Sequence, residues 1–209
     1  MGKILVILNG KGGVGKTTTS FNIAAVFAEK NRVLLVDSDS QESATWWAQQ
    51  GNQNFEIATE TDPNVLKHLK TVEDYDLIVC DTPPHLDSET FTTLIHTGDY
   101  IVLPTPPAPL DIQALIATIQ FAIHPVGVPH RVCLTKVDPR SLNEAMAAQN
   151  TFMEAGVPVF NTFIRAYKAH ERAPLDGLPI IQWKGKNATE AASDYRRLVK
   201  ELTELKEWN

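Results

Sequence analysis

The chain has 209 residues, 43% of them hydrophobic and 21% charged, with a formal net charge of −6. These values suit a globular domain with a sizeable core, and the lack of a run of about 18 apolar residues excludes a membrane-spanning helix. The N-terminus lacks the pattern of a secretory signal, and Cys80 and Cys133 lie inside apolar runs, so we expect a cytoplasmic protein with buried thiols.

Short apolar runs alternate with longer segments of helical pattern along the chain. The strand-like runs are rich in Val, Ile and Leu, which indicates burial on both faces, as in a parallel sheet. The alternation predicts an α/β fold with a doubly wound, mostly parallel sheet and helices on both faces, forming one domain over residues 1–209. The expected strands are 3–8, 32–37, 55–59, 76–81, 100–105, 131–136 and 157–164, and the expected helices are 16–30, 43–50, 63–71, 87–97, 110–123, 141–155 and about 189–207.

The loop after the first expected strand fits the phosphate-loop pattern G-x-x-x-x-G-K-[ST] through Gly10, Gly15, Lys16 and Thr17. Its glycines allow successive backbone N–H groups to point at one phosphate, and the following helix adds its positive N-terminal end. We expect Lys16 to bind the β and γ oxygens and Thr17 to ligate Mg²⁺. The predicted nucleotide-binding residues are Gly10, Lys11, Gly12, Gly13, Val14, Gly15, Lys16, Thr17 and Thr18.

Acidic residues follow two further strands. Asp81 ends the run "DLIVCD", and Asp37 and Asp39 follow "VLLV". Asp37 could be a strand-end residue or a helix cap, whereas Asp39 lies further into the loop and can reach the nucleotide or its attacking water. We predict Thr17, Asp39 and Asp81 as the magnesium ligands, because the carboxyl ends of parallel strands form the ligand-binding edge of such sheets.

Several motifs carry a resemblance to one family. "KGGVGKTT" resembles the deviant Walker A motif of the ParA/MinD family, which has an added lysine near the start of the loop. "VLLVDSDSQESAT" is similar to the ParA switch I stretch, with Ser40 in place of a proline, and "DLIVCDTPP" to the Walker B and switch II region. "CLTKVDPR" and "ERAPLDGLPI" fall where the family has comparable segments, so the resemblance covers residues 1 to about 182.

The resemblance implies an ATPase with ATP and Mg²⁺ as cofactors and a homodimer that sandwiches ATP. Lys11 would reach the partner's phosphates, Lys16 would bind those of its own subunit, and Asp39 would position the attacking water, which makes these three the catalytic residues. Without an N-terminal helix-turn-helix extension, the chain resembles the short ParA-type partition ATPases. These bind nonspecific DNA and respond to a ParB-like adaptor, so we expect a nucleoid-associated protein that segregates or positions a plasmid, chromosome or other cargo.

Three alternatives remain at this stage. A MinD-like ATPase would cycle on a membrane through a basic amphipathic C-terminal helix, but the segment from Asp194 onward has four basic and four acidic residues, so we expect no membrane partner. An iron–sulfur protein would need cluster-ligating cysteines, and the sequence has no C-x-x-C. "TKVD" at 135–138 resembles a guanine-reading motif, although the family resemblance favours ATP.

A basic region precedes the C-terminal helix. Residues 161–200 carry eight basic and four acidic side chains, a local charge of +4. If "FIRAYKAHERAP" is helical, Arg165, Lys168 and Arg172 share one face, and we predict them as the DNA-binding residues. Lys184 and Lys186 follow in a short loop.

Overall fold

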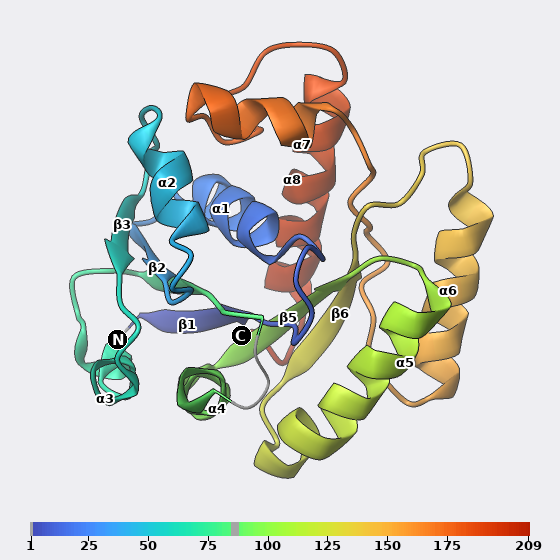
Figure 1. The fold of residues 1–209 in the computed structure, drawn as a ribbon, viewed down its shortest axis with the longest axis horizontal. Helices are drawn as coiled ribbons and strands as arrows, with labels where there is room; N and C mark the ends of the chain where they lie inside the picture. The colour runs from blue at the N-terminus through green and yellow to red at the C-terminus, as the bar shows by residue number, and fades with distance from the viewer. Residues whose placement is uncertain (1, 85–87) are drawn as a thin grey trace.

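Six parallel strands form one sheet in the order β3-β2-β4-β1-β5-β6 (Figure 1). The structure is a computed structural model and describes residues 2–84 and 88–209. The parallel α/β architecture predicted from the sequence is confirmed. The strands are β1 (Lys3–Ile7), β2 (Val33–Asp37), β3 (Glu56–Thr59), β4 (Leu77–Asp81), β5 (Tyr100–Thr105) and β6 (His130–Leu134).

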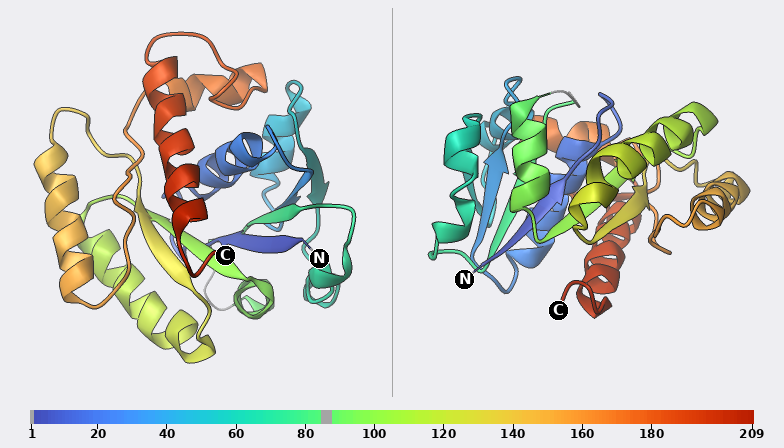
Figure 2. Two further views of the ribbon diagram at one scale, coloured as in Figure 1. Left: turned by 180° about the vertical axis from the view of Figure 1, so that it is seen from behind. Right: turned by 90° about the horizontal axis from the view of Figure 1, so that it is seen from below.

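Helices cover both faces of the sheet, as the alternating pattern predicts (Figure 2). The helix expected over 87–97 begins at Glu89, and residue 87 lies outside the described residues. The helix expected over 63–71 is split into two short turns. The helices are α1 (Lys16–Phe27), α2 (Ser43–Gln49), α3 (Pro63–Leu66), η1 (Leu69–Thr71), α4 (Glu89–Thr97), α5 (Pro109–Thr118), the π-helical turn η2 (Ile119–Ile123), η3 (His124–Val126), α6 (Leu142–Glu154), α7 (Ala169–Arg172), η4 (Ala173–Asp176) and α8 (Ala188–Glu204).

The prediction of a seventh strand over 157–164 is wrong. This segment makes two isolated bridges beside the edge strand, Val132 with Val159 and Val137 with Arg165. The N–H groups of Asn161 and Thr162 donate to the Glu201 carboxylate at 2.7 and 2.9 Å instead of to β6. The segment is apolar because it lies between the sheet edge and α8, a location that apolar content does not distinguish from a strand.

Alternating side chains of the central strands enter two separate cores. Leu5 and Ile7 of β1 pack with α1, α2 and α8 on one face, whereas Ile4 and Val6 pack with α3, α4, α5 and α6 on the other. Cys80 in β4 and Cys133 in β6 are fully buried within these layers, as expected. Burial raises the pKa of both thiols well above the usual value.

The parallel arrangement brings the predicted functional loops to one edge. In the register of the sheet, Asp81 lies beside Ile7 on one side and Asp37 on the other. The phosphate loop follows β1, so it lies at the same carboxyl edge as the acidic residues. No helix in the described part of the chain has the length and apolar character needed to cross a membrane.

Candidate functional site

The phosphate loop joins β1 to α1 through backbone conformations that favour glycine. Gly13 and Gly15 have φ angles of +73° and +97°, in the left-handed region, and Gly15 is the residue that caps α1. Thr135 after β6 donates through its hydroxyl to the Val14 carbonyl at 2.7 Å, and so anchors the underside of the loop. Val14 is therefore a buried support, with its side chain 3% exposed.

Lys16 lies beneath the loop. Its side chain is 7% exposed, and its Nζ donates to the Lys11 carbonyl at 2.9 Å, spanning the loop from end to start. Burial lowers the pKa of Lys16, while the charges of Asp81 and Asp39 oppose that shift. The ammonium group is thus held between the start of the phosphate loop and two acidic neighbours.

Asp81 carries the strongest signal for a cation. It is 1% exposed, and among the described residues neither oxygen of its carboxylate has a hydrogen-bond partner of normal geometry. Burial raises the pKa of Asp81 to about 7, against the lowering influence of the nearby Thr17 and Ser20 hydroxyls. An oxygen-preferring dication would offset the cost of burying this carboxylate, so the donors present, Asp81 and Thr17, fit Mg²⁺.

The two aspartates at the carboxyl end of β2 have different roles. Asp37 is fully buried and accepts the N–H groups of Thr45 at 2.8 Å and Asp39 at 3.3 Å, so it organises the turn into α2. Asp39 is half-buried, and its carboxylate accepts only the N–H of Gln41 among the described hydrogen bonds, at 3.0 Å. The sequence left open whether Asp37 is a strand-end residue or a helix cap. In the structure it ends β2, and its carboxylate also accepts an N–H from the first turn of α2.

Most of the predicted nucleotide-binding residues line one cavity of about 410 Å³ at the sheet edge, together with Asp39. Gly10, Lys11, Val14 and Asp81 do not line it directly. Lys136 also lines this cavity, although the sequence analysis did not include it in the site. The lining residues of the phosphate loop and α1 are Gly12, Gly13, Gly15, Lys16, Thr17 and Thr18.

Lys11 is held at the rim of the loop by a contact with α5. Its Nζ lies 2.7 Å from Oδ1 of Asp111 in the first turn of that helix, with the two side chains 44% and 21% exposed. The two lysines of the loop therefore occupy different environments: Lys16 is buried and faces the cavity, and Lys11 is accessible to solvent.

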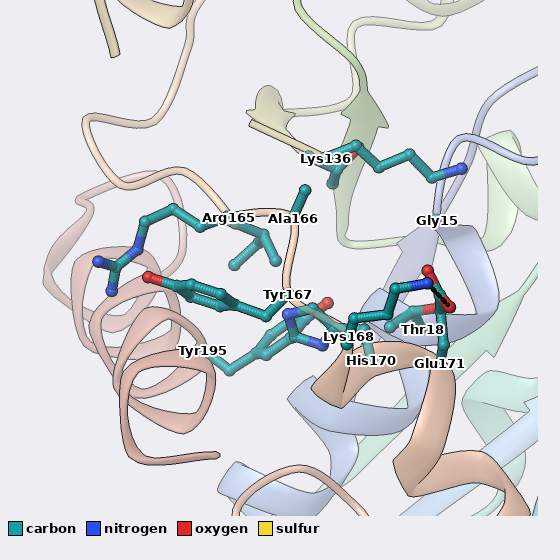
Figure 3. Close-up of a pocket in the computed structure, with 12 residues that line it drawn as sticks. Gly15, Thr18, Lys136, Arg165, Ala166, Tyr167, Lys168, His170, Glu171 and Tyr195 are labelled. Atoms are coloured by element: carbon teal, nitrogen blue, oxygen red, sulfur yellow. Dashed lines mark hydrogen bonds and ion pairs between the residues drawn. The ribbon is translucent and has the colours of Figure 1, made fainter. Parts of the chain in front are cut away.

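A second cavity of about 460 Å³ adjoins the first and shares Gly15, Thr18 and Lys136 with it (Figure 3). The other wall of this cavity is formed by the segment that follows residue 163, which includes Tyr167, and by Tyr195 of α8. Lys136 adopts a φ of +53° just beyond β6. Its position after a strand at the carboxyl edge is the signal that could have included it in the predicted site.

The guanine-reading interpretation of "TKVD" loses support. Asp138 is bound by its neighbour Arg140 through Nε at 3.1 Å, Nη2 at 2.8 Å and the backbone N–H at 2.9 Å. This pairing lowers the pKa of Asp138 to about 2. Asp138 does not line either cavity, so a base bound there would not meet its carboxylate.

The prediction that Arg165, Lys168 and Arg172 share one helical face is wrong. The helix α7 begins at Ala169, and Arg165 lies in the bridge to Val137 instead. The Arg165 guanidinium binds the fully buried Asp194 of α8. Tertiary pairing with a buried carboxylate thus overrides the helical spacing, and Arg165 and Lys168 line the second cavity.

The C-terminal helix α8 packs on the domain, mainly against α1, as predicted from its balanced charge. Leu198 and Leu202 are fully buried, and Trp208 beyond the helix is 8% exposed. These side chains belong to the core that α8 shares with α1. Asp194 lies on the same helical stripe as Ala191 and Leu198, and this acidic residue in an apolar stripe is the signal that sequence analysis missed.

Comparisons with known proteins agree with this geometry. Residues 5–180 match the family model of the CobQ/CobB/MinD/ParA nucleotide binding domain. The chain is 57% identical over 202 residues to "Maintenance of carboxysome distribution protein A" of Gloeobacter kilaueensis, covering 96% of this chain and 94% of that protein. The fold is similar to MinD with Mg-ADP from Pyrococcus horikoshii (TM-score 0.80, 21% identity, 98% of each chain) and to an ATP complex of an McdA variant from Cyanothece (TM-score 0.77, 16% identity, 97% of this chain and 96% of that one). This chain belongs to the CobQ/CobB/MinD/ParA nucleotide-binding family.

Proposed function

We propose that this protein is a ParA-type ATPase that dimerises around ATP and distributes a large cargo, of which the carboxysome is the leading candidate. The observation that carries the proposal is the pair of lysines in one loop, with Lys16 buried toward the cavity and Lys11 exposed at its rim. The cargo follows from the near full-length relative named for carboxysome distribution. The carboxysome therefore replaces the plasmid or chromosome as the favoured cargo.

The residues of the first cavity suit phosphoryl transfer to water. The loop N–H groups and Lys16 would bind the phosphates, and Thr17 and Asp81 would hold Mg²⁺, which when bound neutralises charge on the phosphate oxygens. Asp39, half-buried at the cavity wall, would orient the attacking water. Lys11 would supply a positive charge to the partner subunit's site, and it must leave Asp111 to do so.

We assign the base and ribose of ATP to the second cavity. It adjoins the phosphate site through Gly15 and Thr18, which is where a nucleoside attached to loop-bound phosphates would extend. Tyr167 is half-buried, and its ring, together with the apolar side chains that line this cavity, suits a flat heterocycle.

A nonspecific DNA interface remains part of the proposal, with a changed set of residues. Arg172, Lys184 and Lys186 are exposed, whereas Arg165 is engaged with Asp194. We propose the three exposed cations as phosphate contacts, doubled in the dimer. A ParB-like adaptor would act on that dimer and stimulate hydrolysis.

The membrane-cycling alternative has less support. The leucines that would have to enter a lipid surface are in the core, and the exposed face of α8 carries both signs of charge, including Lys200 and Glu204 as an ion pair. Strong ATP-dependent pelleting with anionic liposomes would return that alternative to first place.

The test of activity is phosphate release from ATP by wild type and Lys16→Ala. We expect turnover by wild type and none by the variant, because the phosphates lose their buried cation. Wild type that neither binds nor hydrolyses ATP with Mg²⁺ contradicts the assignment. In the source organism, removing the gene should cause fluorescently tagged carboxysomes to cluster. Carboxysomes that stay evenly spaced after removal would show that they are not the cargo.

DNA binding is tested by a salt titration of duplex binding with ATP and with ADP. Wild type with ATP should bind with a slope near −0.9 per phosphate neutralised, and ADP should abolish binding. Arg172→Glu combined with Lys184→Glu and Lys186→Glu should remove binding while ATP dimers persist. Retention of DNA by this variant would exclude the three residues as the interface.

A further inference from the structure

We propose that Asp194 is a positioning residue for nucleotide binding, because through Arg165 it fixes the wall of the second cavity. The inference rests on the proposed function, in which that cavity holds the base. It concerns a residue on α8 that does not line the cavity itself.

The contact between Asp194 and Arg165 is extensive. The Arg165 Nε donates to Oδ2 at 2.9 Å and Nη2 donates to Oδ1 at 2.7 Å, the fork geometry of a bidentate pair. The Arg165 backbone N–H also donates to Oδ2, at 3.1 Å. One carboxylate therefore holds both the side chain and the main chain of the same residue.

Burial makes this contact specific. The Asp194 side chain is fully buried, and its second cationic partner is Arg197, one turn further along α8. Leaving a buried carboxylate without its bidentate partner is strongly unfavourable, so Arg165 is constrained to stay beside Asp194. The pair is not a surface contact that can open at little cost.

The constraint acts on the cavity wall from the side opposite the sheet. On the sheet side, the Ile164 N–H donates to the Leu134 carbonyl at 2.8 Å and the Ala166 N–H donates to the Val137 carbonyl at 2.7 Å. Arg165 lies between these two residues and is tied to Asp194. The wall is thus fixed alternately to α8 and to β6 with the loop that follows it.

The Arg165 side chain also supports the ring that faces the cavity. Its guanidinium lies 5.1 Å from the centre of the Tyr167 ring, and Figure 3 shows the Arg165 side chain extending away from Lys136 alongside that ring. With Arg165 released, the backbone at 164–166 keeps only its sheet-side hydrogen bonds, and the Tyr167 ring loses the guanidinium beside it. The phosphate loop has its own anchor, Thr135, and should be unaffected.

This separation gives a specific test by calorimetric titration with two probes, Mg-ATP and Mg-tripolyphosphate, which has no base. For Asp194→Asn we expect the ATP dissociation constant to rise about tenfold or more, the scale of a lost charged hydrogen bond. The dissociation constant for tripolyphosphate should stay within about twofold of wild type. Because the buried variant can fail to fold, Arg165→Gln provides a second route to the same prediction, and the double variant should lose no more than either single one.

The matched control is Glu201→Gln. Glu201 lies two turns further along the same face of α8 and binds the same chain segment at Asn161 and Thr162, outside the cavity. We expect both probes to bind it as they bind wild type. Equal weakening of ATP and tripolyphosphate by Asp194→Asn and Arg165→Gln, or unchanged ATP affinity in both, overturns the inference. If wild type binds ATP no more tightly than tripolyphosphate, the base adds no affinity, and this would instead contradict the assignment of the base to this cavity.

Discussion

Replacing Asp111 by asparagine should strengthen ATP-dependent dimerisation. In the isolated subunit Lys11 Nζ lies 2.7 Å from the Asp111 carboxylate, at the rim of the phosphate loop. If Lys11 acts on the partner's phosphates, this ion pair has to break in both subunits when the dimer forms. Asparagine keeps the shape of the side chain and removes the charge that competes for Lys11.

The size of the effect follows from the exposure of the pair. With side chains 44% and 21% exposed, the pair belongs to the class of surface ion pairs worth roughly 0.2–1 kcal/mol. Two such pairs per dimer amount to roughly 0.4–2 kcal/mol, and since 1.4 kcal/mol is a factor of ten, the dimer dissociation constant should fall by roughly 2- to 30-fold. Salt screens the pair, so the gain should shrink at high ionic strength.

The assay is analytical ultracentrifugation with ATP at low salt, in an Asp39→Ala background, in which we expect turnover to be slow. Glu29→Gln is the control, because it removes a comparable surface ion pair, with Arg196, away from the loop. The control should dimerise like its parent. Unchanged or weaker dimerisation of Asp111→Asn would refute the idea that Asp111 holds Lys11 back from the interface.

Three further predictions test the site and the fold. Asp39→Ala should still bind ATP and dimerise but release phosphate at least about 100-fold more slowly, as sizing and phosphate-release assays would show; normal turnover would remove Asp39 from the mechanism. Lys11→Ala should bind ATP as a monomer and fail to hydrolyse it, whereas sedimentation as an active ATP dimer would reduce Lys11 to an ordinary loop residue. Burial lowers the pKa of His170, so below the ordinary value of 6.5 the unfolded chain takes up a proton that the folded chain resists, and stability is lost as pH falls. When the pH falls from 7.5 to 5.5, the unfolding free energy of wild type should therefore drop by up to about 1.4 kcal/mol more than that of His170→Asn. Urea titrations of both proteins at the two pH values measure this difference, and an equal drop in both would contradict the prediction.

The parts of the site that the sequence predicted are those encoded locally. The spacing of Gly10, Gly15, Lys16 and Thr17 specifies a loop within one short segment. Asp81 stands at the carboxyl end of an apolar run, which is the end of a parallel strand where ligands bind. Six of the seven expected strands form, and five of them are mostly buried runs, whereas the edge strand β3 is largely exposed.

The parts that it missed depend on contacts between distant segments. Lys11 meets Asp111 a hundred positions later, and Arg165 meets Asp194 across the gap between the sheet edge and α8. Helical spacing alone cannot reveal that the buried carboxylate of Asp194 binds Arg165, one of the three basic residues expected on one helical face. The segment 157–164 is apolar enough for a strand, but Glu201 takes the N–H groups of Asn161 and Thr162, which interrupts a ladder with β6 between Phe160 and Ile164.

The buried thiols in the sheet have a practical consequence for studying dimerisation. Cys80 and Cys133 are the only two cysteines of the chain, both are 0% exposed, and their raised pKa keeps them protonated at neutral pH. Maleimide dyes react with accessible thiolates, so neither native cysteine should compete for label. A single cysteine introduced at an exposed position such as Gln120 would carry one fluorophore per subunit. Energy transfer between donor- and acceptor-labelled subunits could then follow assembly and release through each nucleotide cycle, in a protein that keeps both of its native cysteines.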